Sequence, residues 1–400
     1  MNRSNISRRK ILGTAALSGT SGVVLFRTSN AEAASTTQGE NSWPMQGANP
    51  KGTNRVPSDQ APSSDTIQKN WSTGIPSGEA ITPVVNNNRV VAGTKRPNLI
   101  LTSINSETGK KQWNHTTEDY THSSPVFEKR SIVLPADGKL ERRSSRDGQR
   151  KDNKEIPNSP GTLIDCISTN NHIIFSDMAG VGARKRGESN IEWKYAVKSR
   201  HTPQKVVSDS NTVYVATKGV SEDGCQRQGK VHSLRLSNGS HNWTFSMPTD
   251  IRELAISETV ILVGAVGQLC AISPETGSKI WQKSTKTGSP GLAIKGDSLI
   301  FGGYGLVSKI DIMTGEIIWE QNFNSDYINP AVAGNTVFVA GSGRNRAKWE
   351  AKIKYFDIES GQKKASHHLN EGRIHGPALA NDTLFVTADS GTAYAFTGGD

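Results

Sequence analysis

The sequence predicts an all-β fold, an eight-bladed β-propeller of four-stranded antiparallel blades that is closed by an N-terminal strand. Three observations lead to this prediction. A pattern ending in tryptophan recurs along the chain, the intervals between the tryptophans fit one repeat length, and the last repeat lacks a strand. A period of about 40 residues with four strands per repeat is typical of propeller blades.

Each copy of the pattern predicts a strand, a turn and a second strand. Apolar residues alternate before the turn, as in a strand with one buried face. The turn contains glycine, which adopts positive φ at no steric cost. Four residues later the tryptophan would wedge against the neighbouring sheet. The good copies are Ser103–Trp113, Ser233–Trp243, Ala271–Trp281 and Lys309–Trp319; a weaker copy ends at Trp193, one near Asp147-Gly148 is degenerate, and Tyr355–Ala365 has lost its tryptophan.

The two ends of the chain predict how the ring closes. The last repeat, Gly376–Phe396, supplies only three strands, whereas Lys69–Ser72 resembles a tryptophan strand without a blade. We therefore expect Trp71 beside the strand Gly391–Phe396, which also removes an exposed sheet edge. The predicted docking tryptophans are then Trp71, Trp113, Trp193, Trp243, Trp281 and Trp319.

The N-terminus has the features of an export signal. Arg8 and Arg9 lie in a stretch that resembles the twin-arginine motif, an apolar stretch follows, and Ala33 ends a small-x-small cleavage site. The apolar stretch, of about 16 residues, is too short to span a membrane. We expect a signal over 1–33, a flexible leader over 34–66 and the propeller over 67–400. The protein would be exported to the cell surface, the periplasm or the medium, with membrane contact only through an uncleaved signal.

Composition narrows the classes of partner and cofactor. The net charge of +10 includes +4 from residues 1–33, and the remaining +6 is too dilute for a nucleic-acid binder. The three cysteines, Cys166, Cys225 and Cys270, are odd in number and widely spaced, so no disulfide framework is predicted, although one bridge could form. No metal-binding motif occurs in the sequence. We expect a monomer without a metal.

The repeat is similar to the tryptophan-docking motif of pyrroloquinoline-quinone (PQQ) repeat propellers. The resemblance covers residues 43–400, and Trp43–Asn49 resembles the opening segment of such proteins. BamB-type members imply a non-enzymatic scaffold that binds a protein or glycan at the cell envelope, with no cofactor. The alternative is a PQQ-dependent dehydrogenase, in which calcium and a vicinal disulfide accompany the cofactor. No two cysteines are adjacent and no residue matches the calcium ligands or the base, so no catalytic residue is assigned.

Strand parity predicts a binding face. Because strands alternate in direction within a blade, the loops that lead into the first strand and those that join the second to the third share one face. Loop residues often carry function, and basic and aromatic ones suit an acidic or glycan ligand, but ordinary solvated loop residues are the alternative. The predicted ligand-binding residues are His122, His201, Arg252, Tyr327, Arg344, Arg346, Trp349 and His375.

Overall fold

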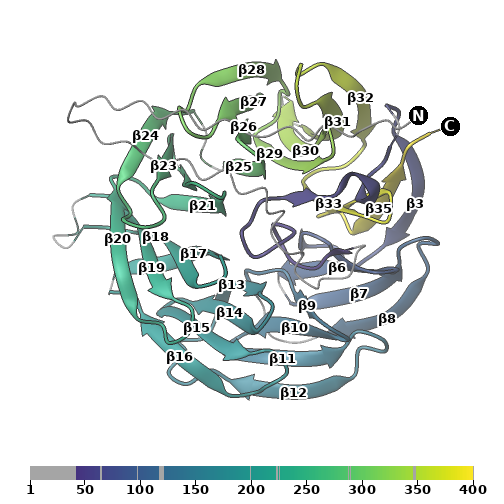
Figure 1. The fold of residues 1–400 in the computed structure, drawn as a ribbon. Coiled ribbons are helices and arrows are strands. Elements are labelled where there is room, and N and C mark those ends of the chain that lie inside the picture. The colour runs from purple at the N-terminus through teal and green to yellow at the C-terminus, as the bar shows by residue number, and fades with distance from the viewer. Residues whose placement is uncertain are drawn as a thin grey trace, which may run out of the picture. The chain divides into compact units, whose positions relative to one another are not determined.

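A computed structural model describes residues 42–399 except 64, 97, 117–120, 199, 222–223, 225, 287, 289 and 346–347. The predicted signal, with Arg8, Arg9 and Ala33, therefore lies outside the described residues, as do Arg346 and Cys225. Eight four-stranded antiparallel sheets surround a central axis, which confirms the predicted eight-bladed propeller (Figure 1). The only helix of the described part is a 3-10 turn, η1, at Ser58–Gln60.

Within each blade the strands are lettered A to D from the axis outward, and blades are numbered 1 to 8 along the chain (Figure 1). The A strands are β5 (Val84–Asn86), β9 (Val126–Glu128), β13 (Leu163–Ser168), β17 (His201–Ser208), β21 (Ile251–Ile256), β25 (Gly291–Lys295), β29 (Tyr327–Ala333) and β33 (Ile374–Ala380). The B strands are β6 (Arg89–Arg96), β10 (Ser131–Ala136), β14 (His172–Asp177), β18 (Thr212–Gly219), β22 (Ile261–Ala265), β26 (Ser298–Gly303), β30 (Thr336–Asn345) and β34 (Thr383–Ala388).

The C strands are β7 (Ile100–Asn105), β11 (Lys139–Ser144), β15 (Gly180–Lys185), β19 (Gly229–Arg235), β23 (Gln268–Ile272), β27 (Leu306–Asp311), β31 (Lys348–Asp357) and β35 (Thr392–Thr397). The D strands are β8 (Lys111–Thr116), β12 (Arg150–Glu155), β16 (Ile191–Ala196), β20 (His241–Met247), β24 (Lys279–Ser284), β28 (Ile317–Asn322), β32 (Lys363–Leu369) and β3 (Gln68–Gly74). Three short strands add to this frame: β1 (Ser42–Trp43), β2 (Arg55–Val56) and β4 (Glu79–Ala80).

Burial follows from this arrangement. Strands such as β10 and β22 are buried along their whole length, because both faces of a blade pack against neighbouring blades. The D strands instead alternate between exposed and half-buried residues, as β24 and β28 do. The apolar core therefore lies between blades rather than along the axis, which leaves polar residues at the centre.

The ring closes as the sequence predicted. β3 pairs with β35 in antiparallel register, with Trp71 opposite Ala395 and Gly74 opposite Thr392. The C and D strands of blade 8 thus come from opposite ends of the propeller and no turn connects them. Since the tryptophan of one blade needs the C–D turn of the next, blade 7 has nothing to dock on in blade 8. This accounts for Ala365, which occupies the tryptophan position of blade 7.

The tryptophans tie neighbouring blades together. Each indole N–H donates to a carbonyl of the next blade's C–D turn, as from Trp281 to Ile312 at 2.8 Å. The glycine of that turn lies against the ring, so that a Cβ added at Gly315 would be 2.8 Å from the Trp281 ring. The carbonyl acceptors for Trp71, Trp113, Trp193, Trp243 and Trp319 are those of Ser106, Ser145, Leu236, Pro274 and Ile358.

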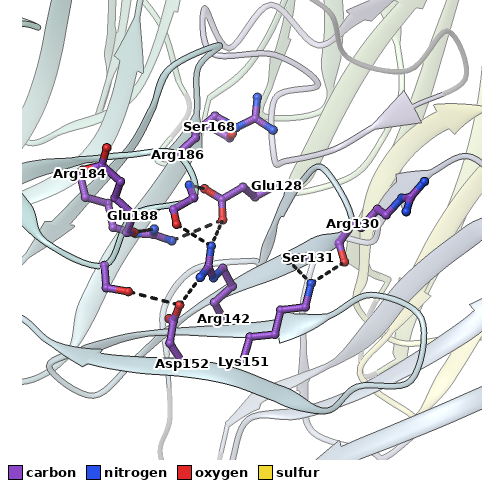
Figure 2. Close-up of polar contacts among 12 residues, drawn as sticks. Glu128, Arg130, Ser131, Arg142, Lys151, Asp152, Ser168, Arg184, Arg186 and Glu188 are labelled. Carbon is purple, nitrogen blue, oxygen red and sulfur yellow. Dashed lines mark hydrogen bonds and ion pairs between the residues drawn. The ribbon is translucent and has the colours of Figure 1, made fainter.

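The junction between blades 2 and 3 uses charged residues in place of a tryptophan. Asp152 lies four residues after the turn glycine Gly148, and its carboxylate forms an ion pair with the Arg142 guanidinium at 2.6 Å (Figure 2). Arg142 also donates to the carbonyl of Gly187 in the blade 3 turn, at 3.0 Å, and the Gly187 N–H donates to Glu128 at 2.8 Å. Glu128 is buried, and Arg184 lies 3.7 Å from it. We call this group the polar junction.

The segment 42–56 differs from the flexible leader predicted over 34–66. Trp43 and Met45 are buried, β1 pairs with β5, and β2 pairs with β29. Between β1 and β2 the segment follows the inner wall of the ring, accepting backbone hydrogen bonds from one A strand after another. In each pair the backbone N–H of the first residue donates to the carbonyl of the second: Phe127 to Pro44, Ser208 to Pro50, Ile256 to Lys51, Ile294 to Thr53 and Val332 to Asn54. The polar composition of the segment suggested flexibility. Composition does not reveal these contacts, because they are made by backbone groups.

Candidate functional site

A polar cavity of about 230 Å³ lies on the propeller axis. The segment 42–56, which we call the inner segment, contributes Gln46, Gly47 and Asn54 to the lining of this cavity. That segment bonds to the C-terminal ends of the A strands, so these residues form the floor of the cavity. The remaining lining comes mainly from residues at the start of the A strands, such as Tyr327 and His375. The cavity is therefore a funnel that opens on the face carrying the loops into strand A, which we call the loop face.

One wall of the funnel carries a buried charge cluster from three successive A strands. The Lys205 ammonium lies 3.4 Å from Asp165 and 3.9 Å from Glu253. Burial, only partly offset by Lys205, raises the pKa of Glu253 to about 7. Burial acts to lower the pKa of Lys205, but the two carboxylates raise it overall. Lys205 therefore remains charged, and its charge is balanced within the wall.

The opposite wall contains two histidines held by partners. His375 bonds to Asp389 at 2.8 Å, and burial lowers its pKa despite the carboxylate. His122 bonds to Arg96, at 2.7 Å from Nε2, and its pKa is lowered by burial and by the Arg96 charge. Both imidazoles are therefore mostly neutral near pH 7 and available as polar rather than cationic groups.

Four side chains form a stack that runs from the funnel to its rim. The Arg373 guanidinium lies 4.3 Å from the centre of the Tyr327 ring, and Tyr327 stacks on Trp349 with centroids 6.1 Å apart. Arg344 covers Trp349 at 5.2 Å. Arg373 and Tyr327 line the funnel, whereas Trp349 and Arg344 come from the paired strands β30 and β31. We call this group the arginine–aromatic column.

Comparison with known proteins agrees with this fold. A family model described as outer membrane protein assembly factor BamB matches residues 16–245 and 265–364, which is well over half of the chain. The chain belongs to this BamB family of PQQ-repeat propellers. A search of curated protein sequences found no match.

Solved structures share the fold of this BamB-family chain at low sequence identity. BamB from Moraxella catarrhalis is 17% identical, with a TM-score of 0.63 over 83% of this chain and 97% of the other. Quinohemoprotein alcohol dehydrogenase from Comamonas testosteroni is 13% identical, with a TM-score of 0.72 over 92% and 82%. The computationally designed Ika8 protein is 16% identical, with a TM-score of 0.67 over 82% and 99%. An assembly factor, an enzyme and a designed protein therefore share this architecture, which by itself assigns no activity.

The funnel of this BamB-family member does not fit PQQ with calcium. Calcium needs several oxygen ligands, yet the described residues contain no group of three or more His, Cys, Asp or Glu side chains placed to hold a metal. The nearby carboxylates are already paired, Glu79 with Lys95 and Asp389 with His375. No tryptophan is among the lining residues of the described funnel. We derive no step through this cofactor.

The structure brings together some of the predicted ligand-binding residues and separates others. His122, Tyr327 and His375 line the funnel, and Trp349 and Arg344 reach it through the column. His201 is buried, and Arg252 lies 3.4 Å from Asp250; neither lines the funnel. Arg344 and Trp349, expected in loops, instead lie opposite each other in the paired strands β30 and β31.

Three contributors to the site were not predicted from the sequence: Arg373, the Lys205–Glu253 pair and the funnel floor. Arg373 lies two residues before His375, in the same loop that the strand parity argument selected, and could have been found there. Lys205 and Glu253 lie at irregularities in their strands, where the register shifts by one residue. Such bulges cannot be located from alternation alone. The remaining cysteines, Cys166 and Cys270, are buried and free.

Proposed function

We propose that this BamB-family chain is an exported, non-enzymatic propeller that binds a protein or glycan partner at the cell envelope through its loop face. The arginine–aromatic column carries the proposal. Cationic and aromatic side chains are stacked beside a funnel, which suits recognition of an external ligand. Export rests on the twin-arginine-like sequence around Arg8 and Arg9. Among the described residues no helix is long and apolar enough to cross a membrane.

The funnel contains polar groups but no assembled set of reactive ones. The histidines His122 and His375 are each held by a partner, and the funnel's carboxylate Glu253 faces Lys205. This favours a binding role and no cofactor over the dehydrogenase alternative.

Site-specific photocrosslinking tests this proposal in the full chain, in the envelope of the cells that make it. A benzophenone amino acid at Lys348, which is exposed beside the column, is expected to give a discrete adduct on irradiation. The matched control is Glu258, an exposed residue on the opposite face, which is expected to give none. Equal labelling from both positions, or none from Lys348, would contradict binding through the loop face.

A cofactor titration tests the alternative independently. The purified chain from residue 34 onward is mixed with PQQ, with and without calcium, and tryptophan fluorescence is recorded. No saturable quenching is expected. Calcium-dependent saturation would reinstate the quinoprotein alternative.

A further inference from the structure

We infer that the funnel binds the carboxylate-bearing end of an acidic saccharide, with Arg373 as the group that receives the carboxylate. The inference rests on the proposed binding function of the loop face and names its ligand class. It combines three observations, which concern the presentation of Arg373, the charge balance of the funnel and the neutral groups around it.

The column presents Arg373 as an anion receptor. Its guanidinium carbon lies over the Tyr327 ring, 4.3 Å from the ring centre. The N–H groups lie in the guanidinium plane and point outward from its edge, where they match the two oxygens of a carboxylate. Among the described residues the Arg373 side chain has no hydrogen bond or ion pair to a protein acceptor. Tyr327 is braced in turn by Trp349, so the receptor is ordered before a ligand arrives.

The lysines of the funnel are paired with carboxylates within the protein. Lys95 lies 3.0 Å from Glu79, and Lys205 lies between Asp165 and Glu253. Asp389 and Glu79 are near enough to Arg373 for its charge to lower their pKa values, but neither is in ion-pair contact with it. Glu79 pairs with Lys95, and Asp389 is hydrogen-bonded to the neutral His375. Arg373 is thus the cation of the described funnel whose charge is not neutralised by contact. A ligand carboxylate at this position would give Arg373 a charge-assisted hydrogen-bond partner.

Neutral polar groups surround the receptor and favour a saccharide. The lining includes amides and hydroxyls of Gln46, Asn54, Thr82, Ser124 and Asn329. Such groups both donate and accept, as the hydroxyls of a sugar ring require. An acidic peptide would need the guanidinium but would leave many of these groups facing aliphatic surface, which costs free energy.

The dimensions indicate the end of a chain rather than its middle. The volume of about 230 Å³ is below the roughly 300–1,000 Å³ of sites that enclose drug-sized ligands. Arg344, at the outer end of the column, can receive a second carboxylate from the next residue of the saccharide. Affinity should therefore rise from a monomer to a dimer of the acidic sugar.

Titration calorimetry with defined sugars tests the inference. The probes are galacturonic acid, digalacturonic acid, the neutral disaccharide of galactose and a tetrapeptide of glutamate. We expect digalacturonic acid to bind more tightly than galacturonic acid and the neutral disaccharide not to bind. Arg373→Gln should weaken binding at least about tenfold, equivalent to ~1.4 kcal/mol. Arg344→Gln should weaken only the disaccharide. Arg55→Gln, which removes an exposed arginine at the opposite end of the channel, is the matched control and should change nothing.

The alternative outcomes separate this inference from the proposed function. Equal binding of neutral and acidic disaccharides, or wild-type affinity in Arg373→Gln, would overturn the carboxylate assignment. Binding of the glutamate peptide in preference to the sugars would overturn the saccharide class. Failure of all probes together with a specific Lys348 crosslink would refute the ligand class and leave loop-face binding intact. Failure of both experiments would refute both.

Discussion

The contact between a tryptophan and the glycine of the next blade can be isolated by two alanine substitutions. Gly315 and Gly187 both lie in C–D turns, those of blades 6 and 3, with φ of 73° and 82°. A Cβ at Gly315 would lie 2.8 Å from the Trp281 ring, whereas a Cβ at Gly187 would meet nothing within 4 Å. The two substitutions therefore share the backbone effect and differ in the ring.

The magnitudes follow from these two terms. Alanine in the left-handed region costs about 1–2 kcal/mol, which is the whole expected effect of Gly187→Ala. Gly315→Ala adds overpacking against the indole, roughly 1–3 kcal/mol more. In a Trp281→Ala background that clash disappears, so Gly315→Ala should then cost no more than Gly187→Ala.

Urea unfolding followed by far-UV circular dichroism supplies the free energies of unfolding for the four variants. Circular dichroism is preferred because Trp281→Ala removes a fluorophore. The double-mutant comparison should give a coupling energy of about 1–3 kcal/mol between the two sites. Equal costs for Gly315→Ala and Gly187→Ala, or additive costs with Trp281→Ala, would refute the view that the ring and the glycine form one docking unit.

Three further predictions concern charge and closure. At the polar junction, Arg142→Ala removes the cation that pairs with Asp152 and lies 3.9 Å from buried Glu128, and should lower the free energy of unfolding by about 2–4 kcal/mol. Glu258→Gln at the exposed Lys51 pair should change it by under about 1 kcal/mol in the same urea assay. Because the folded pKa of Glu253, about 7, lies above its ordinary value of 4.5, its contribution to stability is complete below about pH 4.5 and is lost as the pH rises through 7. Glu253→Gln should remove up to about 3 kcal/mol of this pH dependence, and parallel stability profiles for the two proteins between pH 5 and 8 would contradict the assignment. Ending the chain after Gly391 removes β35 and exposes β3, so this variant should aggregate in light scattering, while Trp71→Ala should remain monomeric but less stable by about 3 kcal/mol.

The ring architecture could be predicted from the sequence because the signals that indicate it are local and repeated. Trp71 could be placed beside β35 since the last repeat lacked a strand and the first tryptophan lacked a blade. The polar junction could not be predicted in this way, because Arg142 and Asp152 replace a ring contact with an ion pair that has no fixed sequence pattern. The inner segment was missed for a related reason, since its partners are backbone groups of distant strands.

The residues of the candidate site likewise fall into those that the repeat pattern predicts and those that it does not. Tyr327 and His375 were found because their place before strand A is a matter of strand parity, which the repeat fixes. The column was only partly found, as Trp349 and Arg344 were placed in a loop although they belong to a long hairpin. Arg252 and His201 share the sequence position of the others but turn to Asp250 or into the protein interior. The side-chain direction at a strand's first residue depends on local register shifts, and these cannot be predicted from the alternation of strand direction.

The pairing of β3 with β35 also sets the time at which the protein can first become native. About 320 residues separate Gly74 from Thr392, its partner in the ladder. At 5–20 residues per second, a ribosome needs roughly 15–60 s to make that stretch. Throughout this interval the nascent chain carries β3 as an unpaired strand that can associate with other chains. Blade 8 is complete only after β35 has been made, so the first-made of the lettered strands is among the last to pair.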